Sequence, residues 1–143
     1  MAAPQKIVTP APKGWESPII PLEKPFVDKR GEIIPLVDAD MKSCVLITSK
    51  KGTVRANHYH KTDWHYCYVM DGEIEYHWRP VGAKEPAKKI TIKKGQMFYT
   101  GPNLEHAMVF TQDTVFLTLG GNPRDQYSYE QDLVRIPLVP VPA

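Results

Sequence analysis

Three histidines lie close together in the stretch NHYHKTDWHYCYVMDGE, which runs from Asn57 to Glu73. Side chains alternate between the two faces of a β-strand, so His58 and His60 point to the same side. After a short connection, the next strand-like segment begins near His65. If this second strand lies beside the first, the three imidazoles can meet at one point.

A fourth histidine, His106, begins an apolar segment in which Met108 and Phe110 share its face. His106 is therefore expected to point into the core. His77 differs, because the residues that share its face are charged. We predict that His77 faces outward and binds no ligand.

Imidazoles buried in an apolar barrel cost free energy unless their polar atoms have partners. One divalent transition metal would provide that partner, and iron, zinc, nickel, manganese and copper all accept imidazole ligands. We therefore predict a metal site formed by four histidines, namely His58, His60, His65 and His106. Hydrogen bonds or water, without a metal, would also satisfy these rings, and this alternative stays open.

The segments around these histidines have the pattern of short β-strands. Strand-like runs recur at residues 31–38, 42–49, 53–60, 64–71, 73–80, 88–94, 97–101, 106–111 and 114–121. Turn signals separate them at the regular spacing that is typical of an all-β sandwich or barrel. The pair Asp71-Gly72 is the strongest hairpin signal. Helix is expected at most in a turn near residues 129–132.

The chain of 143 residues is long enough for one domain with a hydrophobic core. Prolines are frequent at both ends of the chain. We therefore predict an extended Pro-rich arm at residues 1–26, the β domain at 27–136 and a Pro-rich tail at 137–143.

Charge and hydropathy narrow the range of partners. The formal net charge is only +2, and the lysine pairs lack the interleaved aromatic residues of a nucleic-acid surface, so no nucleic acid is expected to bind. No apolar run approaches the roughly 20 residues that span a bilayer, and no signal peptide is visible. Two cysteines without CxxC spacing suit a reducing compartment. The expected location is the cytoplasm, with no membrane partner.

The spacing of the histidines resembles the two signature motifs of the cupin superfamily. The first motif, G(X)5HXH(X)3-4E(X)6G, matches Gly52, His58, His60, His65 and Gly72, with His65 where the family usually has Glu. The second motif, G(X)5PXG(X)2H, matches Gly95 and His106, with Gly101 where Pro is usual and Asn103 where Gly is usual. The resemblance implies an all-β cupin jelly-roll barrel, also called a double-stranded β-helix. It also implies one metal in the mouth of the barrel and a homodimer.

Two narrower resemblances point toward nucleotide-sugar chemistry. The stretch RANHYH is similar to RGNHYH in the metal-binding C-terminal cupin domain of capsular polysaccharide enzymes, with Ala56 for Gly, and NPRDQYSYEQDLVRI is similar in character to the ending of those domains. The stretch from Asp28 to Gly31 resembles the D-x-R-G lead-in of dTDP-sugar 3,4-ketoisomerases and 3,5-epimerases. The resemblance implies that these sugar enzymes use histidine as a base and work without a metal. A histidine that is held by a metal is not free to act as a base.

Three functions are compatible with the sequence. The first is a metal-dependent isomerase or epimerase of a small carbonyl or sugar-type compound, in which Tyr99 or Glu105 moves a proton. Core packing is the alternative for Tyr99, and a solvated loop position is the alternative for Glu105. The second function is a cupin dioxygenase with a four-histidine metal site. The third is a non-catalytic cupin that binds a small ligand.

Other side chains suggest contacts with partners. Trp64, Tyr66 and Tyr68 lie on the strand face opposite His65 and are predicted to form a packing surface. That surface is either a homodimer interface or is covered by the Pro-rich arm. Arg55 either meets a carboxylate or phosphate of a small-molecule substrate, or lies at the rim, solvated or paired with Asp63.

Overall fold

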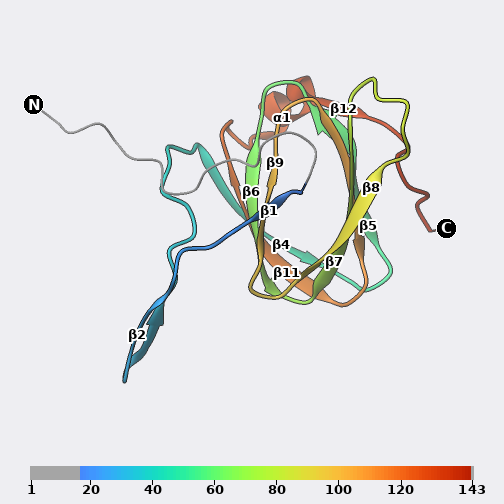
Figure 1. The fold of residues 1–143 in the computed structure, drawn as a ribbon. Helices are drawn as coiled ribbons and strands as arrows, with labels where there is room; N and C mark the ends of the chain where they lie inside the picture. Colours follow the sequence, from blue (N-terminus) through green and yellow to red (C-terminus); the bar gives the residue numbers. More distant parts are fainter. Residues whose placement is uncertain (1–16, 143) are drawn as a thin grey trace, which may run out of the picture.

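The computed structural model describes residues 17–142, which form a barrel of two facing antiparallel sheets (Figure 1). One five-stranded sheet has the order β1 (Ile19–Ile20), β9 (Met97–Thr100), β6 (His65–Asp71), β11 (Thr114–Gly120) and β4 (Ser43–Ser49). The other has the order β12 (Leu133–Arg135), β5 (Val54–His60), β10 (Leu104–Phe110), β7 (Glu73–Pro80) and β8 (Lys88–Lys93). The predicted all-β jelly-roll barrel is confirmed.

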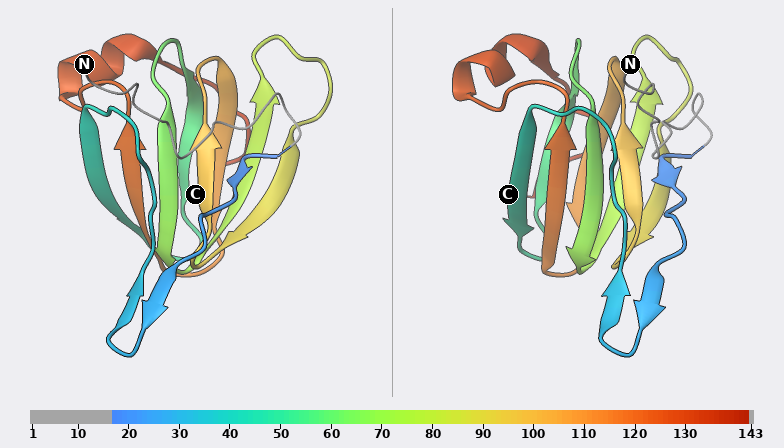
Figure 2. Two further views of the ribbon diagram at one scale, coloured as in Figure 1. Left: turned by 60° about the vertical axis from the view of Figure 1, so that its left-hand side comes forward. Right: turned by 90° about the vertical axis from the view of Figure 1, so that its left-hand side faces the viewer.

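Two further elements lie at opposite ends of the barrel (Figure 2). The hairpin of β2 (Phe26–Asp28) and β3 (Gly31–Ile33) projects beyond one end, and helix α1 (Gln126–Asp132) lies at the other. Asp125 caps this helix, because its side chain accepts a hydrogen bond from the backbone N–H of Ser128. Among residues 17–142, no helix is long and apolar enough to cross a membrane.

Every predicted strand segment contains a strand, but the ends of the chain differ from expectation. The segment 31–38 is a strand only as far as Ile33. Within the predicted arm, β1 pairs with β9 and so belongs to a barrel sheet. The tail is attached to the barrel, since Val139 exchanges two hydrogen bonds of 3.0 Å with the side chain of Asn57. Residues 1–16 of the arm and residue 143 of the tail lie outside the described residues.

The chain before β4 covers the outer face of the first sheet. Tyr66 and Leu119 are buried there beneath Ile20, and Leu36 and Met41 pack against the same cluster. The predicted aromatic surface is therefore covered by this chain's own N-terminal segment. Both faces of this sheet are therefore apolar, the inner face in the barrel and the outer face beneath the N-terminal segment.

The main core lies between the two sheets and follows the alternation of the strands. On β7, Ile74, Tyr76 and Trp78 are buried in this core. His77 points to the opposite side, where its Nε2 atom lies 2.8 Å from Glu75 Oε1. The predicted outward orientation of His77 is confirmed.

A β-bulge interrupts β5 before its histidines. His106 of β10 lies opposite His58, but the next residue, Ala107, lies opposite Ala56, so Asn57 is the extra residue. Ala56 and Asn57 both have positive φ, at 71° and 57°. The bulge resets the alternation, so that Arg55 and His58 both line the same cavity.

The bulge generates a prediction about stability. A non-glycine residue in the left-handed region costs roughly 1–2 kcal/mol. Replacing it with glycine removes this cost, but the greater conformational entropy of glycine in the unfolded chain offsets part of the gain. We therefore expect Ala56→Gly to raise the free energy of unfolding by about 1 kcal/mol, measured by urea denaturation. Ala107→Gly is the control, because Ala107 is fully buried in a regular strand and should lose about 0.5–1 kcal/mol. A loss of stability in Ala56→Gly would contradict the argument.

Candidate functional site

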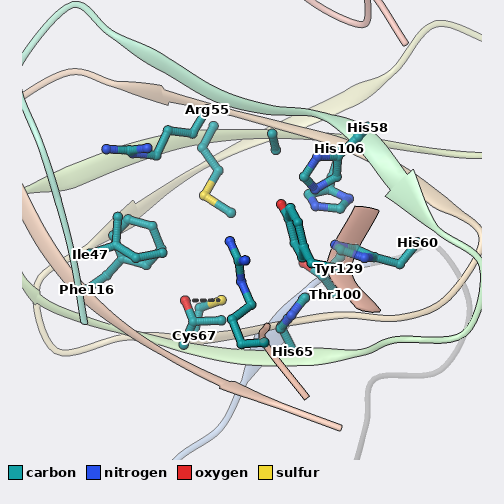
Figure 3. Close-up of a pocket in the computed structure, with 14 residues that line it drawn as sticks. Ile47, Arg55, His58, His60, His65, Cys67, Thr100, His106, Phe116 and Tyr129 are labelled. Atoms are coloured by element: carbon teal, nitrogen blue, oxygen red, sulfur yellow. Dashed lines mark hydrogen bonds between the residues drawn. The ribbon is translucent and has the colours of Figure 1, made fainter. Parts of the chain in front are cut away.

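A cavity of about 140 Å³ opens between the two sheets beneath the segment that contains α1 (Figure 3). Both sheets and the chain around α1 contribute to its wall. The lining residues are Ile47, Arg55, Ala56, His58, His60, His65, Cys67, Thr100, His106, Met108, Phe116, Thr118, Arg124 and Tyr129. The four histidines that the sequence singled out therefore all reach one cavity.

Three of these histidines converge on one wall. His58 and His60 are on β5, and His106 faces His58 across the β5–β10 pair. One ring nitrogen from each of the three lies within 4.8 Å of the others. This separation suits three imidazoles around a single transition metal ion, with other coordination positions left for a ligand.

The protonation of the three rings also suits metal binding. Burial, reinforced by neighbouring histidines, lowers the pKa of His58 to about 2 and the pKa of His106 to about 3. Burial and His65 lower the pKa of His60 to about 4, although Asp63 and Asp132 act in the opposite direction. All three imidazoles are therefore neutral at neutral pH, and each has a nitrogen lone pair to donate.

Polar groups lie beside two of these rings, and one of them forms a hydrogen bond. His106 Nδ1 lies 2.9 Å from the backbone carbonyl of Leu104, which can only accept, so Nδ1 carries the proton and Nε2 keeps its lone pair. His60 Nδ1 is buried without a hydrogen bond, and its nearest acidic atom is Asp132 Oδ2 at 3.3 Å. Carbonyl and carboxylate partners of this kind commonly orient metal-binding histidines. The donor set therefore fits a divalent transition metal.

His65 approaches the three-histidine cluster from the facing sheet, and its ring nitrogens are not among those that lie within 4.8 Å of one another. Its strand does not lie beside β5, because β6 belongs to the facing sheet and pairs with β9 and β11. His65 reaches across the barrel to within 4.9 Å of His60, measured between ring centroids. Its Nε2 atom is 3.0 Å from Asp63 Oδ2. The structure thus brings three of the predicted ligands together and pairs the fourth with a carboxylate.

Asp63 is held rigidly behind His65. Its Oδ1 atom accepts hydrogen bonds from the backbone N–H groups of Trp64 at 2.8 Å and Asn122 at 2.9 Å. Burial raises the pKa of Asp63, but the His65 contact and these backbone bonds outweigh it and lower the pKa below its ordinary value. The carboxylate is therefore ionised and fixed in position. The alternative pairing of Arg55 with Asp63 does not occur, since Arg55 donates to Ser49 Oγ and the Thr48 carbonyl.

The two predicted proton-transfer residues lie outside the cavity. Tyr99 is on the outer face of its sheet, packed against Tyr66 with ring centroids 5.0 Å apart. Glu105 is buried in an ion pair with Arg79, 2.7 Å between Nη2 and Oε1. The structure corrects both assignments, because neither side chain lines the space next to the histidines.

Sequence reasoning missed the contribution of the C-terminal segment. The Tyr129 ring lies 5.6 Å from the His60 ring and 6.2 Å from the His58 ring, and Figure 3 draws it among the histidines. Arg124 lies over the Tyr129 ring, with its guanidinium carbon 3.5 Å from the centroid. A helical turn was expected here, but nothing in the local pattern places it over a cavity formed far away in the sequence.

Comparison with known proteins identifies the family. The model of the cupin domain family matches residues 45–119, which is more than half of the chain and includes all four cavity histidines. The chain belongs to the cupin family. No curated protein sequence matches this cupin.

Solved structures share the fold. A double mutant of the QdtA 3,4-ketoisomerase from Thermoanaerobacterium thermosaccharolyticum, in complex with TDP, is similar at a TM-score of 0.63 and 27% identity, over 78% of this cupin and 82% of that chain. The dTDP-4-dehydrorhamnose 3,5-epimerase from Sulfolobus tokodaii has a TM-score of 0.69 and 18% identity, over 96% and 86%. The capsular polysaccharide assembling protein CapF from Staphylococcus aureus has a TM-score of 0.59 and 20% identity, over 82% of this cupin but only 34% of that chain.

The separation of His65 from the cluster predicts how each histidine affects metal binding. We expect about one equivalent of a divalent transition metal per chain, measured by plasma mass spectrometry and titration calorimetry. His58→Ala and His106→Ala should each weaken affinity at least roughly 100-fold, because each removes a ligand. His65→Gln should weaken metal affinity by at most about tenfold, because His65 contacts the ligands but is not one of them. His77→Gln is the control. Equal losses in the His65 and His106 variants would restore the four-histidine site.

Proposed function

We propose that this cupin is a metal-binding isomerase or epimerase that moves a proton at the carbon next to a carbonyl in a small sugar-type compound. The observation that supports it best is the division of the cavity histidines. Three neutral imidazoles converge with their ring nitrogens within 4.8 Å of one another, and the fourth is held against a carboxylate on the opposite wall. This division supports a metal site and a separate base in one chain.

In this proposal, His58, His60 and His106 hold one divalent transition metal. Iron, zinc, nickel, manganese and copper all suit a set of imidazole ligands. Such an ion, when bound, polarises a carbonyl and makes the neighbouring C–H bond more acidic. The three side chains contribute by holding neutral nitrogen donors at one point.

We assign the proton transfer to His65, in place of the residues predicted from sequence. Asp63 fixes the orientation of the imidazole, as a carboxylate does for a histidine base. The base takes the proton from the carbon next to the carbonyl. In an isomerase it returns the proton to the neighbouring carbon, and in an epimerase a second group donates a proton to the opposite face of the same carbon. Because His65 is outside the three-histidine cluster, its nitrogen is not needed as a ligand.

Tyr129 is the second group that we assign to proton transfer. Burial raises the pKa of its phenol, although Arg124 and Arg135 act in the opposite direction. The hydroxyl is therefore protonated at neutral pH and can donate a hydrogen bond or a proton to an oxygen of the substrate. Its ring lies beside His58 and His60, so it can approach the same substrate as the cluster.

Several neighbours support a carbonyl substrate of the sugar type. One mutant of the QdtA 3,4-ketoisomerase was solved in complex with TDP-4-keto-6-deoxyglucose, a compound with a ketone in its sugar ring. The Sulfolobus protein is described as a 3,5-epimerase of dTDP-4-dehydrorhamnose. Both reaction classes transfer protons beside a carbonyl. We extend to this cupin the reaction type, and leave the identity of the compound to experiment.

The proposal predicts exchange of a carbon-bound hydrogen with solvent. Metal-loaded protein in D₂O should remove the proton signal next to the carbonyl of at least one of three probes: dihydroxyacetone, dihydroxyacetone phosphate or TDP-4-keto-6-deoxyglucose. His65→Gln should slow this exchange at least roughly 100-fold, as expected for loss of a general base, without loss of bound metal. Tyr99→Phe is the control and should exchange at the wild-type rate, because Tyr99 lies on the outer face.

Other outcomes of this assay would replace the proposal. Oxygen consumption with the same probes would favour a cupin dioxygenase. A ligand that stays bound without exchange or oxygen uptake would favour a non-catalytic binding cupin. Exchange at an unchanged rate in His65→Gln would remove His65 from its assigned role.

We also propose that the protein forms a homodimer through the β2–β3 hairpin. A two-stranded hairpin without further packing is only marginally stable in water. Phe26, Val27 and Ile33 of this hairpin are 60%, 67% and 65% exposed. A second copy of the chain would cover these apolar side chains.

The hairpin predicts the effect of surface substitutions on the molecular mass. Wild-type protein should have the mass of two chains by light scattering, and Phe26→Ser combined with Ile33→Ser should shift it toward the mass of one. Val141→Ser is the matched control, since Val141 is 66% exposed in the tail rather than in the hairpin. A monomeric wild type, or a double variant that remains dimeric, would contradict the assignment.

A further inference from the structure

The charges that line the cavity are all of one sign. Arg55 and Arg124 line it, whereas none of its lining residues is an aspartate or glutamate. Two carboxylates lie behind lining histidines, with Asp63 Oδ2 3.0 Å from His65 Nε2 and Asp132 Oδ2 3.3 Å from His60 Nδ1. The charged side chains that line the cavity itself are therefore both cationic.

The two cavity arginines differ from the other arginines of the chain in their partners. Arg30, Arg79 and Arg135 each form an ion pair with a carboxylate, at Asp28, Glu105 and Glu130 respectively. Within residues 17–142, Arg55 and Arg124 form no ion pair with a carboxylate. Both of the arginines that lack an acidic partner thus face the same cavity.

Neutral groups hold each of these two guanidinium groups in place. Arg55 donates from Nε to Ser49 Oγ at 2.6 Å and from Nη2 to the Thr48 carbonyl at 3.0 Å. A guanidinium has five N–H donors, so others remain for a ligand. Arg124 lies over the ring of Tyr129. Both arginines are positioned without being neutralised, which is the arrangement that recognises a carboxylate or phosphate.

The size of the cavity limits the ligand. A volume of about 140 Å³ is below the roughly 300–1,000 Å³ of sites that enclose drug-sized ligands. Ile47, Met108 and Phe116 provide apolar wall beside the charged groups. The space thus suits a compact molecule with one anionic group and a short carbon chain.

We propose that the substrate is a small anionic carbonyl compound, whose carboxylate or phosphate binds Arg55 and Arg124 while its carbonyl faces the histidine cluster. This inference rests on the proposed function and specifies the substrate class of that site. In this proposal a single small anionic group holds the substrate, whereas other proteins hold their substrate through an attached nucleotide.

Binding experiments test the proposal without requiring turnover. Metal-loaded protein is titrated by calorimetry with pyruvate, dihydroxyacetone phosphate, the neutral analogue dihydroxyacetone, and TDP. We expect at least one of the two small anions to bind roughly tenfold or more tightly than dihydroxyacetone, because hydrogen bonds to charged groups are the stronger ones. The preference between pyruvate and dihydroxyacetone phosphate identifies the group as carboxylate or phosphate.

Matched arginine variants locate the anion. Arg55→Gln and Arg124→Gln should each weaken binding of the small anion roughly tenfold or more and leave dihydroxyacetone unaffected. Arg30→Gln is the control, because Arg30 lies on the projecting hairpin. This substitution removes the same charge far from the cavity. Thermal unfolding of each ligand-free variant verifies that folding is unchanged. Both cavity arginines are exposed at the surface, so loss of their charge should not prevent folding.

Four results would overturn the inference. The first is equal affinity for the neutral analogue, and the second is no difference between the cavity variants and Arg30→Gln. The third is binding of TDP without binding of either small anion. The fourth is anion binding that is abolished by chelation of the metal but is not altered in the arginine variants. Solvent exchange with dihydroxyacetone alone would also overturn it while leaving the proposed isomerase intact. Arginine-dependent anion binding without any exchange would support this inference and contradict the proposed reaction.

Discussion

The carboxylate of Asp132 connects the segments that form the cavity end of the barrel. Oδ1 accepts hydrogen bonds from the backbone N–H and the hydroxyl of Thr62 at 2.8 and 2.6 Å, and Oδ2 accepts one from the N–H of Asp63 at 3.0 Å. Burial raises the pKa of Asp132, but these bonds outweigh it and keep the pKa below its ordinary value. Asp132 ends α1, while Thr62 and Asp63 join β5 to β6. One ionised side chain therefore fixes Tyr129 above the cavity and the carboxylate partner of His65 beside it.

The facing sheets give the two walls of the cavity different chemistry. The β5–β10 wall presents neutral nitrogen donors, and the β-bulge before His58 lets an arginine share this wall with them. The β6 wall presents His65 with its carboxylate, and next to it Cys67. Burial raises the pKa of the Cys67 thiol to about 12, so it stays protonated and contacts Thr118 Oγ1 at 3.6 Å. Cys67 therefore packs against the site as a neutral group rather than as a thiolate ligand.

The sequence predicts the strands well because alternation and turn chemistry are local properties. It also identifies which residues share a face, as for His58 with His60. The sequence does not show which face of a strand points into the barrel when both faces of the sheet are buried. Met97 and Tyr99 share a face, which packs against the N-terminal segment, while Phe98 lies in the core between the sheets. Strand pairing is equally non-local, since the short connection after His60 crosses to the other sheet instead of forming a hairpin. The contribution of Arg124 and Tyr129 depends on the hydrogen bonds of Asp132 to residues about 70 positions away.

The replacement of a carboxylate by His65 changes the charge of the whole cavity. At this position of the motif the cupin pattern usually has Glu, which would face the cavity as an anion. Here the carboxylate lies behind the imidazole, at Asp63, where His65 and two backbone N–H groups are bound to it. Three neutral imidazoles would leave a bound divalent ion with its full charge, and Arg55 and Arg124 add to it. The proposed base and the proposed anionic substrate are thus connected with one substitution, because His65 replaces a carboxylate in the cavity where Arg55 and Arg124 have no ion pair within residues 17–142.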